Sequence, residues 1–206
     1  FTSCCPGWIK FCEHYYPEFI GNLSSCKSPQ QKFGALVKSY YAEKFGIKPE
    51  DIFTVSIMPC TAKKFEVQRP EMTATGTPDV DVSLTTRELA DMIKRAGIEF
   101  TALPDELADP VFGIASGAGH IFGATGGVME AALRTVAEIV TGKPLEKLEF
   151  EAVRGVEAIK EAEYDLNGTV VRVAVTSGLS NASKLLDMVK RGEKHYHFIE
   201  VMACPG

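Results

Sequence analysis

Cysteines in three short segments are the residues of this chain best suited to bind iron. Cys4 and Cys5 are adjacent near the start, Cys60 lies in the first third of the chain, and Cys204 stands close to the last residue. Cysteine thiolates are the usual ligands of iron-sulfur clusters, which commonly have four of them. The spacing suggests a cluster whose ligands come from three distant loops, with the set not completed before the chain stops at Gly206.

The immediate surroundings of these cysteines favour rigid loops. A proline stands next to each of Cys5, Cys60 and Cys204. The chain has no compact C-x-x-C run, so separate loops would have to be held together by the scaffold. For Cys12 and Cys26 we favour another interpretation, in which each is a small buried hydrophobic residue. A strained disulfide within the adjacent pair is a minor alternative.

The composition excludes several classes of protein. The 206 residues fit one large domain or two small lobes, and 45% of them are hydrophobic, enough for an ordinary core. The net charge is −5 and no basic run occurs, which argues against a nucleic-acid partner. No apolar stretch is long enough to span a membrane. Six cysteines suit a reducing, intracellular setting better than a disulfide scaffold, and the missing initial Met indicates that the true N-terminus is absent.

Helical and strand patterns alternate along the chain, which favours an α/β or α+β class. Runs rich in β-branched and aromatic residues predict strands. These runs are Ile52–Met58, Val80–Leu84, Thr169–Val175 and Phe198–Met202.

Capping boxes predict two helices. In a capping box, the side chains of the cap residue and of the third helical residue accept hydrogen bonds from each other's backbone amides. Ser28 with Gln31 predicts the first helix, which should stop at Gly46. Thr85 with Glu88 predicts the second.

Further helices follow from apolar spacing. Hydrophobic residues at helical intervals over 128–140 predict one helix, and another should run from about Ser180 to Arg191. The segments Arg69–Pro78 and Leu103–Pro110 are expected to be surface connections. The glycine-dense run Ser116–Gly127 allows tight turns or close approach of backbone, and it matches neither a Walker motif nor a dinucleotide fingerprint.

Three segments resemble, in order, the signature motifs of the FeFe-hydrogenases. They are Thr2–Trp8, Met58–Glu66 and Glu200–Gly206, termed here the first, second and third motifs. Ser116–Ala132 also resembles the glycine-rich segment of that family, and the similarity extends from the first residue to the last. The resemblance implies an α/β fold of two lobes of mixed β-sheet flanked by helices, with the cluster site in the cleft between them. Residues 1–206 would then be a partial H-cluster domain, truncated at both ends.

The resemblance implies an H-cluster as cofactor. This is a 4Fe-4S cubane joined through a cysteine sulfur to a di-iron unit that carries CO, cyanide and an azadithiolate. By motif position, Cys5, Cys60 and Cys204 match three of the four cubane ligands. The fourth would lie a few residues beyond Cys204 and is absent from this chain.

Roles in proton transfer and cofactor anchoring follow from the same resemblance. Cys4 matches a cysteine that carries protons, and Ser24 resembles a later member of the same relay. Lys63 matches a lysine that binds a cyanide ligand, a charge-assisted contact. We expect Glu66 to pair with Lys63 and support it.

Five other residues are expected to line the cofactor site. Met58, Met202 and Phe122 resemble residues of the di-iron pocket, and core methionines are the plainer alternative. Pro29 and Gln30 begin a helix whose positive N-terminal end suits an anionic cluster.

The implied activity is the reversible reduction of protons to H2, with electrons from ferredoxin or from an accessory iron-sulfur domain or subunit. Hydrogenase maturation proteins are further expected partners, and the 206 residues alone should be inactive. A Narf-like iron-sulfur assembly protein without catalytic activity and a sensory hydrogenase are the alternatives. Cys4 and Lys63 favour the catalytic interpretation, because a protein that keeps only the cubane needs neither. A cytoplasmic location is expected, with the periplasm as the alternative.

Overall fold

The computed structural model describes residues 1–113, 116–144, 151–153 and 156–204. The chain divides into two compact units. The N/C-terminal unit comprises Phe1–Ser25 and Ala115–Gly206, and the central unit comprises Cys26–Ile114. The first and third motifs therefore belong to the N/C-terminal unit, and the second motif belongs to the central unit.

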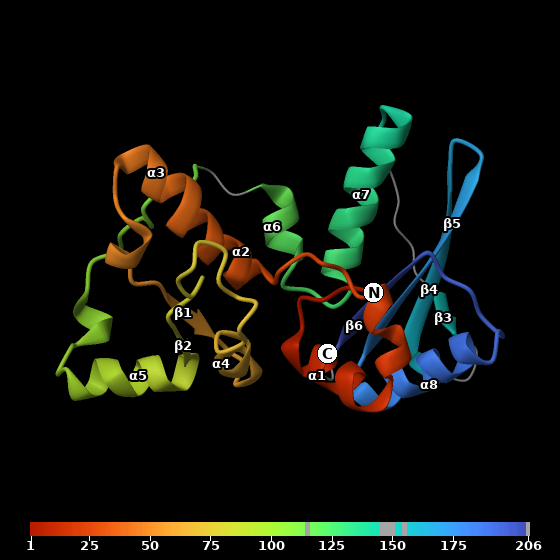
Figure 1. Ribbon diagram of the computed structural model, residues 1–206, viewed down its shortest axis with the longest axis horizontal. Coiled ribbons are helices and arrows are strands. Elements are labelled where there is room, and N and C mark those ends of the chain that lie inside the picture. Colours follow the sequence, from red (N-terminus) through yellow and green to blue (C-terminus); the bar gives the residue numbers. More distant parts are fainter. Residues whose placement is uncertain (114–115, 145–150, 154–155, 205–206) are drawn as a thin grey trace. The chain divides into compact units, whose positions relative to one another are not determined.

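The N/C-terminal unit is built on a four-stranded mixed sheet (Figure 1). Its strands, in spatial order, are β3 (Glu151–Val153), β4 (Val156–Leu166), β5 (Thr169–Ser177) and β6 (Phe198–Met202). The first three are antiparallel, whereas β5 and β6 are parallel. Parallel neighbours need a crossover connection, and α8 (Leu179–Lys190) supplies it. The other helices of this unit are α1 (Pro6–Tyr15), the 3₁₀ helix Pro17–Asn22, α6 (Gly117–Ile121) and α7 (Gly127–Thr141).

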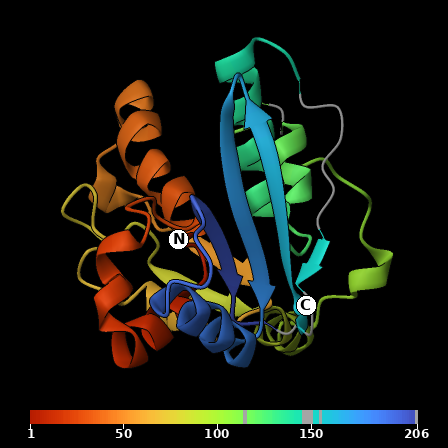
Figure 2. The ribbon, with the colours of Figure 1, turned by 90° about the vertical axis from the view of Figure 1, so that its right-hand side faces the viewer.

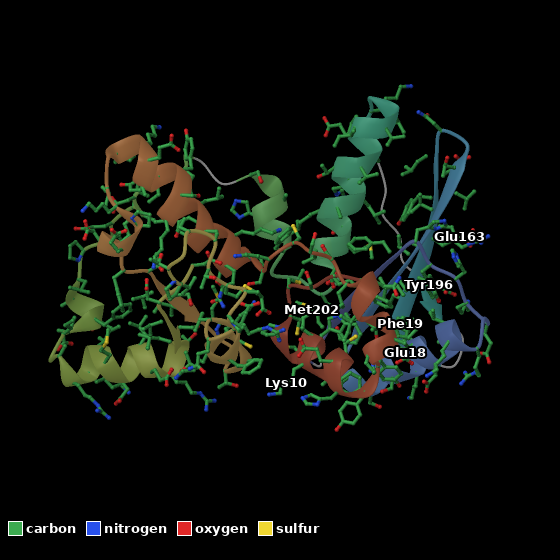
Figure 3. The ribbon with its side chains drawn as sticks, in the orientation of Figure 1. Lys10, Glu18, Phe19, Glu163, Tyr196 and Met202 are labelled. Carbon is green, nitrogen blue, oxygen red and sulfur yellow. The ribbon has the colours of Figure 1, made fainter. Side chains whose placement is uncertain are left out.

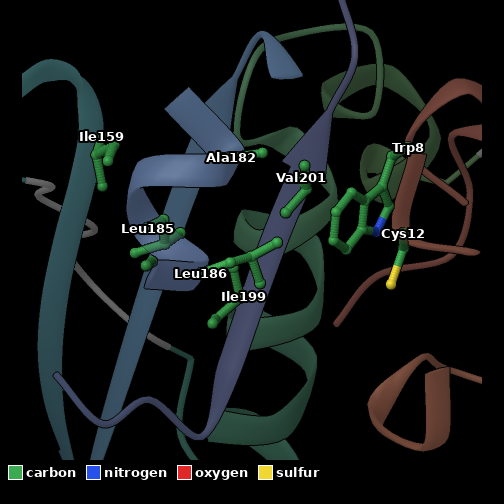
Figure 4. Close-up of a cluster of buried hydrophobic side chains, with 9 residues drawn as sticks. Trp8, Cys12, Ile159, Ala182, Leu185, Leu186, Ile199 and Val201 are labelled. Atoms are coloured by element: carbon green, nitrogen blue, oxygen red, sulfur yellow. The ribbon is translucent and has the colours of Figure 1, made fainter. Parts of the chain in front are cut away.

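Helices cover both faces of this sheet, because successive side chains of a strand point to opposite sides. On one face, Ile199 and Val201 of β6 pack with Trp8 of α1 and Leu185 of α8 (Figure 4). On the other face, Val173 and Val175 of β5 pack with Met129 and Leu133 of α7. Figure 2 shows α7 and α8 on opposite sides of the sheet. Each large apolar side chain buried in these layers contributes about 1.5–3 kcal/mol of hydrophobic free energy.

The central unit holds a two-stranded parallel sheet. Strands β1 (Val55–Met58) and β2 (Val82–Thr85) pair with Val55 opposite Val82. The surrounding helices are α2 (Pro29–Leu36), the π-helical turn Val37–Tyr41, α3 (Ala42–Phe45), the 3₁₀ helix Pro49–Asp51, α4 (Ala62–Glu66), α5 (Thr86–Arg95) and the 3₁₀ helix Phe100–Ala102.

A buried ion pair ties the π-helical turn to the start of β2. Lys38 is 1% exposed, and its Nζ donates to Asp81 Oδ2 and to the Pro78 carbonyl, both at 2.7 Å. Asp81 Oδ2 also accepts the Thr54 amide at 2.6 Å. The half-buried Asp81 carboxylate therefore gives the buried Lys38 ammonium the partner that a buried charge requires.

Most of the predicted elements are confirmed. The α/β class with two sheets flanked by helices is present, and all four predicted strands form, with ends shifted by a few residues. The helix predicted over 29–45 is continuous but contains a π-helical turn, and it ends at Gly46 with φ +64°. The box of Thr85 and Glu88 is complete, with both reciprocal hydrogen bonds.

The predicted capping box at Ser28 is wrong. Ser28 makes no side-chain bond to the helix; its hydroxyl donates to Glu66 Oε2 instead. Gln31 is fully buried, with neither side-chain polar atom bonded among the described residues. A long-range carboxylate has displaced the local cap that the sequence pattern favours.

The sequence analysis did not predict strand β4, because its charged residues obscure the alternation of polar and apolar side chains. Glu161 and Glu163 alternate with Ala162 and Tyr164 along a strand that is only partly buried. The turn that follows carried a usable signal. Leu166 pairs with Thr169 across Asn167-Gly168, whose φ angles of +53° and +85° suit the tight two-residue hairpin that Asn-Gly favours.

Among the described residues, no helix combines the length and the apolar character that a membrane crossing needs.

Candidate functional site

The first motif is anchored to the strand that leads to the third motif. The Thr2 amide donates to the Ile199 carbonyl at 2.9 Å, and the Val201 amide donates to Thr2 Oγ1 at 3.2 Å. The indole Nε1 of Trp8 donates to the Thr2 carbonyl at 3.0 Å. The N-terminal segment therefore lies alongside β6, which places Cys4 and Cys5 close to the residues that follow this strand.

Cys5 occupies the N-cap position of α1, and Pro6 starts the helix. Its side chain is half-buried and in the thiol form, without a disulfide. No side chain caps α1, so the first-turn amides and the positive end of the helix dipole are available to an anion at this position.

The Ala203 backbone amide donates to Cys5 Sγ at 3.3 Å. This contact joins the first motif to the third through the predicted ligand itself. Close packing accompanies it, because a Cβ added to Gly7 would lie 3.0 Å from Ala203 Cβ. The structure thus brings Cys5 beside the segment that carries Met202 and Cys204.

The third motif leaves β6 in a defined conformation. The Gly178 amide donates to the carbonyls of both Met202 and Cys204, at 2.9 and 3.0 Å. Met202 lies at the end of the strand (Figure 3) and is half-buried. Cys204 is exposed and in the thiol form. The start of α8 therefore fixes the backbone on which the predicted ligand Cys204 is carried.

The other predicted residues of the N/C-terminal unit lie on three separate loops. Cys4 is half-buried in the first motif, and Ser24 is exposed, with its amide donating to the Phe1 carbonyl at 2.9 Å. Phe122 is half-buried and directly follows α6. The proton relay from Cys4 to Ser24 and the place of Phe122 in the cofactor pocket stay predictions.

In the central unit, the second motif turns from β1 into α4. Met58 ends the strand, Cys60 follows in the connection, and Lys63 lies in the first turn of the helix. Cys60 is half-buried and in the thiol form. The three predicted residues are thus held within one short strand–turn–helix unit.

A buried carboxylate, Glu66, organises this motif. Its Oε2 accepts hydrogen bonds from Ser28 Oγ at 2.7 Å, Gln30 Nε2 at 2.6 Å and Lys63 Nζ at 3.1 Å. Gln30 Oε1 in turn accepts from Ser56 Oγ at 2.8 Å. The expected pair of Lys63 and Glu66 is confirmed.

The sequence analysis missed the parts that Ser28 and Ser56 play in this network. The sequence pattern predicts a helix cap at Ser28 and an ordinary strand residue at Ser56. No local spacing marks either of them as a partner of Glu66 or Gln30.

Pro29, Gln30 and Met58 line one mainly apolar cavity in the central unit, of about 510 Å³. Its wall also contains aromatic residues, among them Phe33 and Tyr41. The structure therefore brings together the three pocket residues predicted from this half of the chain. A small apolar chamber with a few polar groups at one side is typical of a ligand or cofactor site.

Another cavity, of about 560 Å³, lies beside the residues that precede β6 (Figure 3). Its walls are polar, and Glu161 accepts from Lys194 Nζ at 2.7 Å and from the Tyr196 hydroxyl at 2.6 Å. Burial is the largest cause of a raised pKa of Tyr196, and the hydrogen bond to Glu161 is the next largest. The charged groups already satisfy one another, and Tyr196 and Met202 lie at opposite ends of β6, so this cavity is not part of the candidate site.

The donors present suit an iron-sulfur cofactor. The described residues include no ready-made group of three His, Cys, Asp or Glu side chains that could hold a metal ion. However, Cys5 combines an uncrosslinked thiol with a backbone N–H donor, the kind of outer contact that tunes cluster sulfurs. Lys63 adds an ammonium suited to an anionic ligand. The residues fit the proposed group, and their assignment as ligands stays a prediction.

Comparison with known proteins gives a consistent result. The family model described as "Iron only hydrogenase large subunit, C-terminal domain" matches residues 1–206. Iron hydrogenase 1 of Clostridium pasteurianum is 55% identical over the whole chain, which covers 36% of that protein. The periplasmic Fe hydrogenase large subunit of Nitratidesulfovibrio vulgaris is 54% identical, again over the whole chain, which covers 49% of it. The chain thus spans half or less of the length of these relatives.

The structural comparison agrees. An apo FeFe-hydrogenase from Chlamydomonas reinhardtii superposes with a TM-score of 0.85 at 43% identity, covering 99% of this chain and 58% of that one. A more distant relative, a cytosolic Fe-S cluster assembly factor of Xenopus tropicalis, is 35% identical over 99% of the chain and 44% of its own length.

Proposed function

Because the chain belongs to the family of iron-only hydrogenase large subunits, matching its C-terminal domain, we propose that it forms part of the catalytic domain of an FeFe-hydrogenase. The reaction is the reversible reduction of protons to H2, with electrons supplied by ferredoxin or by accessory iron-sulfur domains. The contact between the Ala203 amide and Cys5 Sγ is the observation that best supports this proposal, because it places the third motif at the predicted ligand of the first.

Cys5, Cys60 and Cys204 would hold the cubane of the H-cluster through their thiolates. At Cys5, Sγ accepts the Ala203 N–H and lies at the uncapped start of α1. Pro59 precedes Cys60, and the Gly178 amide holds the carbonyl of Cys204. Each ligand therefore sits on backbone that is restrained before the cofactor arrives.

When bound, the H-cluster supplies the redox chemistry that interconverts two protons and two electrons with H2. Lys63 Nζ would donate hydrogen bonds to an anionic ligand of this group. Glu66 holds the ammonium from one side at 3.1 Å and is itself restrained by Ser28 and Gln30. Lys63 is thereby aimed through Glu66, a side chain that need not touch the cofactor.

Cys4 would carry the proton to and from the reacting centre at its Sγ, and the Ser24 hydroxyl would continue the relay. A thiol suits this task, because its ordinary pKa lies closer to neutrality than that of a serine hydroxyl. Met58, Met202 and Phe122 would exclude water from the pocket, and Pro29 and Gln30 would form part of its wall.

The similarity to a cytosolic Fe-S cluster assembly factor favours one alternative, a non-catalytic iron-sulfur protein of the Narf type. Lys63 and Cys4 argue against it, because a cubane alone has no cyanide ligand to anchor and no catalytic proton to move. Lys63 is moreover held by a buried carboxylate rather than left at the surface.

The test is a hybrid enzyme, in which this chain replaces the matching segment of the Clostridium pasteurianum relative. The hybrid is matured with a synthetic di-iron unit and assayed for H2 evolution from reduced methyl viologen. We expect H2 evolution that depends on the di-iron unit. A hybrid that binds the cubane but evolves no H2, beside an active parent enzyme, would favour the assembly-protein alternative.

Substitution Cys4→Ser in this hybrid tests the proton relay. We expect H2 evolution to fall by about 100-fold or more, because general acid–base groups contribute at least that much. The EPR signal of the cubane should be retained, since Cys4 is not proposed as a ligand. Turnover at the level of the unsubstituted hybrid would show that the relay assignment is wrong.

A further inference from the structure

Glu200 is a fully buried carboxylate in the third motif that the proposed chemistry does not use. It lies in the middle of β6 and is 0% exposed. Ile199 and Val201 point to the α1 and α8 face, so the alternation of the strand directs Glu200 to the face covered by α7. Met202 comes two residues later and shares that face.

The carboxylate caps α7 from a distance. Glu200 Oε2 accepts the Met129 amide at 2.6 Å. Met129 is the third residue of α7, and its amide belongs to the first turn, where amides have no acceptor within the helix. The residue before the helix is Gly126, which has no side chain to cap it. Glu200 therefore replaces the missing local cap and meets the positive end of the helix dipole.

The turn that Glu200 caps is closely packed against α6. A Cβ added to Gly127 would lie 1.7 Å from the Ile121 carbonyl oxygen, so the end of α6 abuts the start of α7. The chain between α6 and α7, residues 122–126, forms a tight corner. In it the Ala124 amide donates to the Ile121 carbonyl at 3.1 Å, and the Gly127 amide donates to the Ala124 carbonyl at 2.9 Å. Phe122 lies within the corner, directly after α6.

We infer that Glu200 is a positioning residue, which fixes the corner that carries Phe122 against the strand that leads to Met202 and Cys204. The inference rests on the proposed function, in which Phe122 and Met202 line the cofactor pocket and Cys204 is a ligand. It assigns to Glu200 no contact with the cofactor.

Stability alone gives little reason to keep a carboxylate at this position. Glu200 Oε1 has no hydrogen-bond partner among the described residues. Burying a carboxylate without a cation is costly, and packed apolar side chains often serve stability as well or better. An acceptor for the Met129 amide is what an apolar side chain at this position would lack.

The first arm of the test measures amide hydrogen exchange in the hybrid enzyme before the di-iron unit is added. In the unsubstituted hybrid, the Met129 amide should exchange at least about tenfold more slowly than in an unstructured peptide. Glu200→Met keeps a similar volume but removes the acceptor, and it should speed this exchange by about tenfold or more. Glu200→Gln keeps an acceptor oxygen and should stay within about threefold of the unsubstituted protein.

Val201→Ala is the matched control, because Val201 is equally buried on the same strand but faces the opposite layer. It should lower stability without selectively speeding exchange at Met129. The second arm records the infrared bands of CO and cyanide after maturation. Glu200→Met should shift these bands, whereas Glu200→Gln and Val201→Ala should not.

Several results would overturn the inference. The first is a Met129 amide in the unsubstituted hybrid that exchanges at the free-peptide rate. The second is a Met129 amide that exchanges no faster in Glu200→Met than in Val201→Ala. The third is a set of CO and cyanide infrared bands that Glu200→Met leaves unchanged. If Glu200→Met does not fold, a large rise in exchange for Glu200→Gln also overturns it. An unsubstituted hybrid without CO and cyanide bands would instead count against the proposed function. The hydrogen-exchange measurement would still decide whether Glu200 fixes the corner.

Discussion

Each unit buries one glutamate beside residues predicted to hold the cofactor, and the two carboxylates are satisfied in different ways. Glu66 in the central unit accepts from three side chains, including the ammonium of Lys63. Glu200 in the N/C-terminal unit accepts from the backbone at the start of α7, and no cation among the described residues pairs with it. The first arrangement aims a charged side chain, whereas the second fixes the path of the backbone.

This difference matches what each half of the proposed site must do. The central unit would offer Lys63 to an anionic ligand, and a flexible lysine needs a fixed counter-charge to hold its direction. The N/C-terminal unit would offer Cys5 and Cys204 from backbone loops, which backbone hydrogen bonds restrain well. Substitutions that separate the two modes of support should therefore have effects of different size and kind.

The largest effect on stability is expected from Glu66→Ala. This change removes the buried acceptor that the Lys63 ammonium shares with two buried donors, and loss of one partner of a buried pair typically costs about 3–5 kcal/mol. Chemical denaturation should show the loss. Ser56→Ala, which removes only the outermost donor of the network, is the control. A loss below about 1 kcal/mol for Glu66→Ala would mean that Glu66 does not organise the motif.

A smaller, pH-dependent effect is expected at Glu200. Burial raises the pKa of this carboxyl in the folded protein, and hydrogen bonds from the Met129 and Gly126 amides only partly offset it. The folded state therefore retains a proton that the unfolded state has lost, so the Glu200 contribution to the free energy of unfolding falls as pH rises through the raised pKa.

Comparison with Glu200→Gln isolates this contribution. Measured upward from about pH 4, below the ordinary carboxyl pKa, the unfolding free energy of the unsubstituted protein should decline relative to that of the variant, by up to about 1.4 kcal/mol for each unit by which the pKa is raised. Parallel curves for the two proteins would contradict the prediction.

Thr85→Ala should cost about 1 kcal/mol, the usual loss when a capping threonine is removed. Thr85 Oγ1 accepts the Glu88 amide at 3.2 Å, and the Thr85 amide donates to Glu88 Oε2 at 2.8 Å. Thermal denaturation provides the measurement. Glu88 also pairs with Lys64 of α4, but neither residue belongs to the Glu66 network, so cofactor loading should not change, and a loss of loading would show that the two are coupled.

The smallest effect on stability is expected from Gly7→Ala, within about 1 kcal/mol in either direction. Alanine favours a helix by about that amount over glycine, but its Cβ would crowd Ala203 Cβ at 3.0 Å. The crowding acts on the segment that donates to Cys5 Sγ. We therefore expect incorporation of the cubane, measured as iron per protein, to fall more than stability does. Full incorporation would show that the site tolerates movement of the third motif.

Local signals predicted much of the fold. The signals that succeeded depend on neighbours within a few residues, and the structure contains every feature they predicted. They are the capping box of Thr85 and Glu88, the helix end at Gly46, the apolar stripe of α7 and the four β-rich runs. The interpretation of Cys26 as a small buried residue is wrong, because its side chain is exposed. The other failures occurred where pairing within the fold overrode the local pattern. Ser28 bonds to Glu66 rather than to its own helix, and β4 takes its place from pairing with β5 despite its charged pattern.

The sequence by itself determined the family, the three motifs and the pairing of Lys63 with Glu66, because residue identities and short spacings carry that information. Only the tertiary structure decided that the Ala203 amide meets Cys5 Sγ, that Ser28 and Gln30 satisfy Glu66, and that Glu200 caps α7. Each of these contacts joins groups far apart along the chain. They form because a buried polar atom must find a partner, and folding determines which distant donors come within its reach.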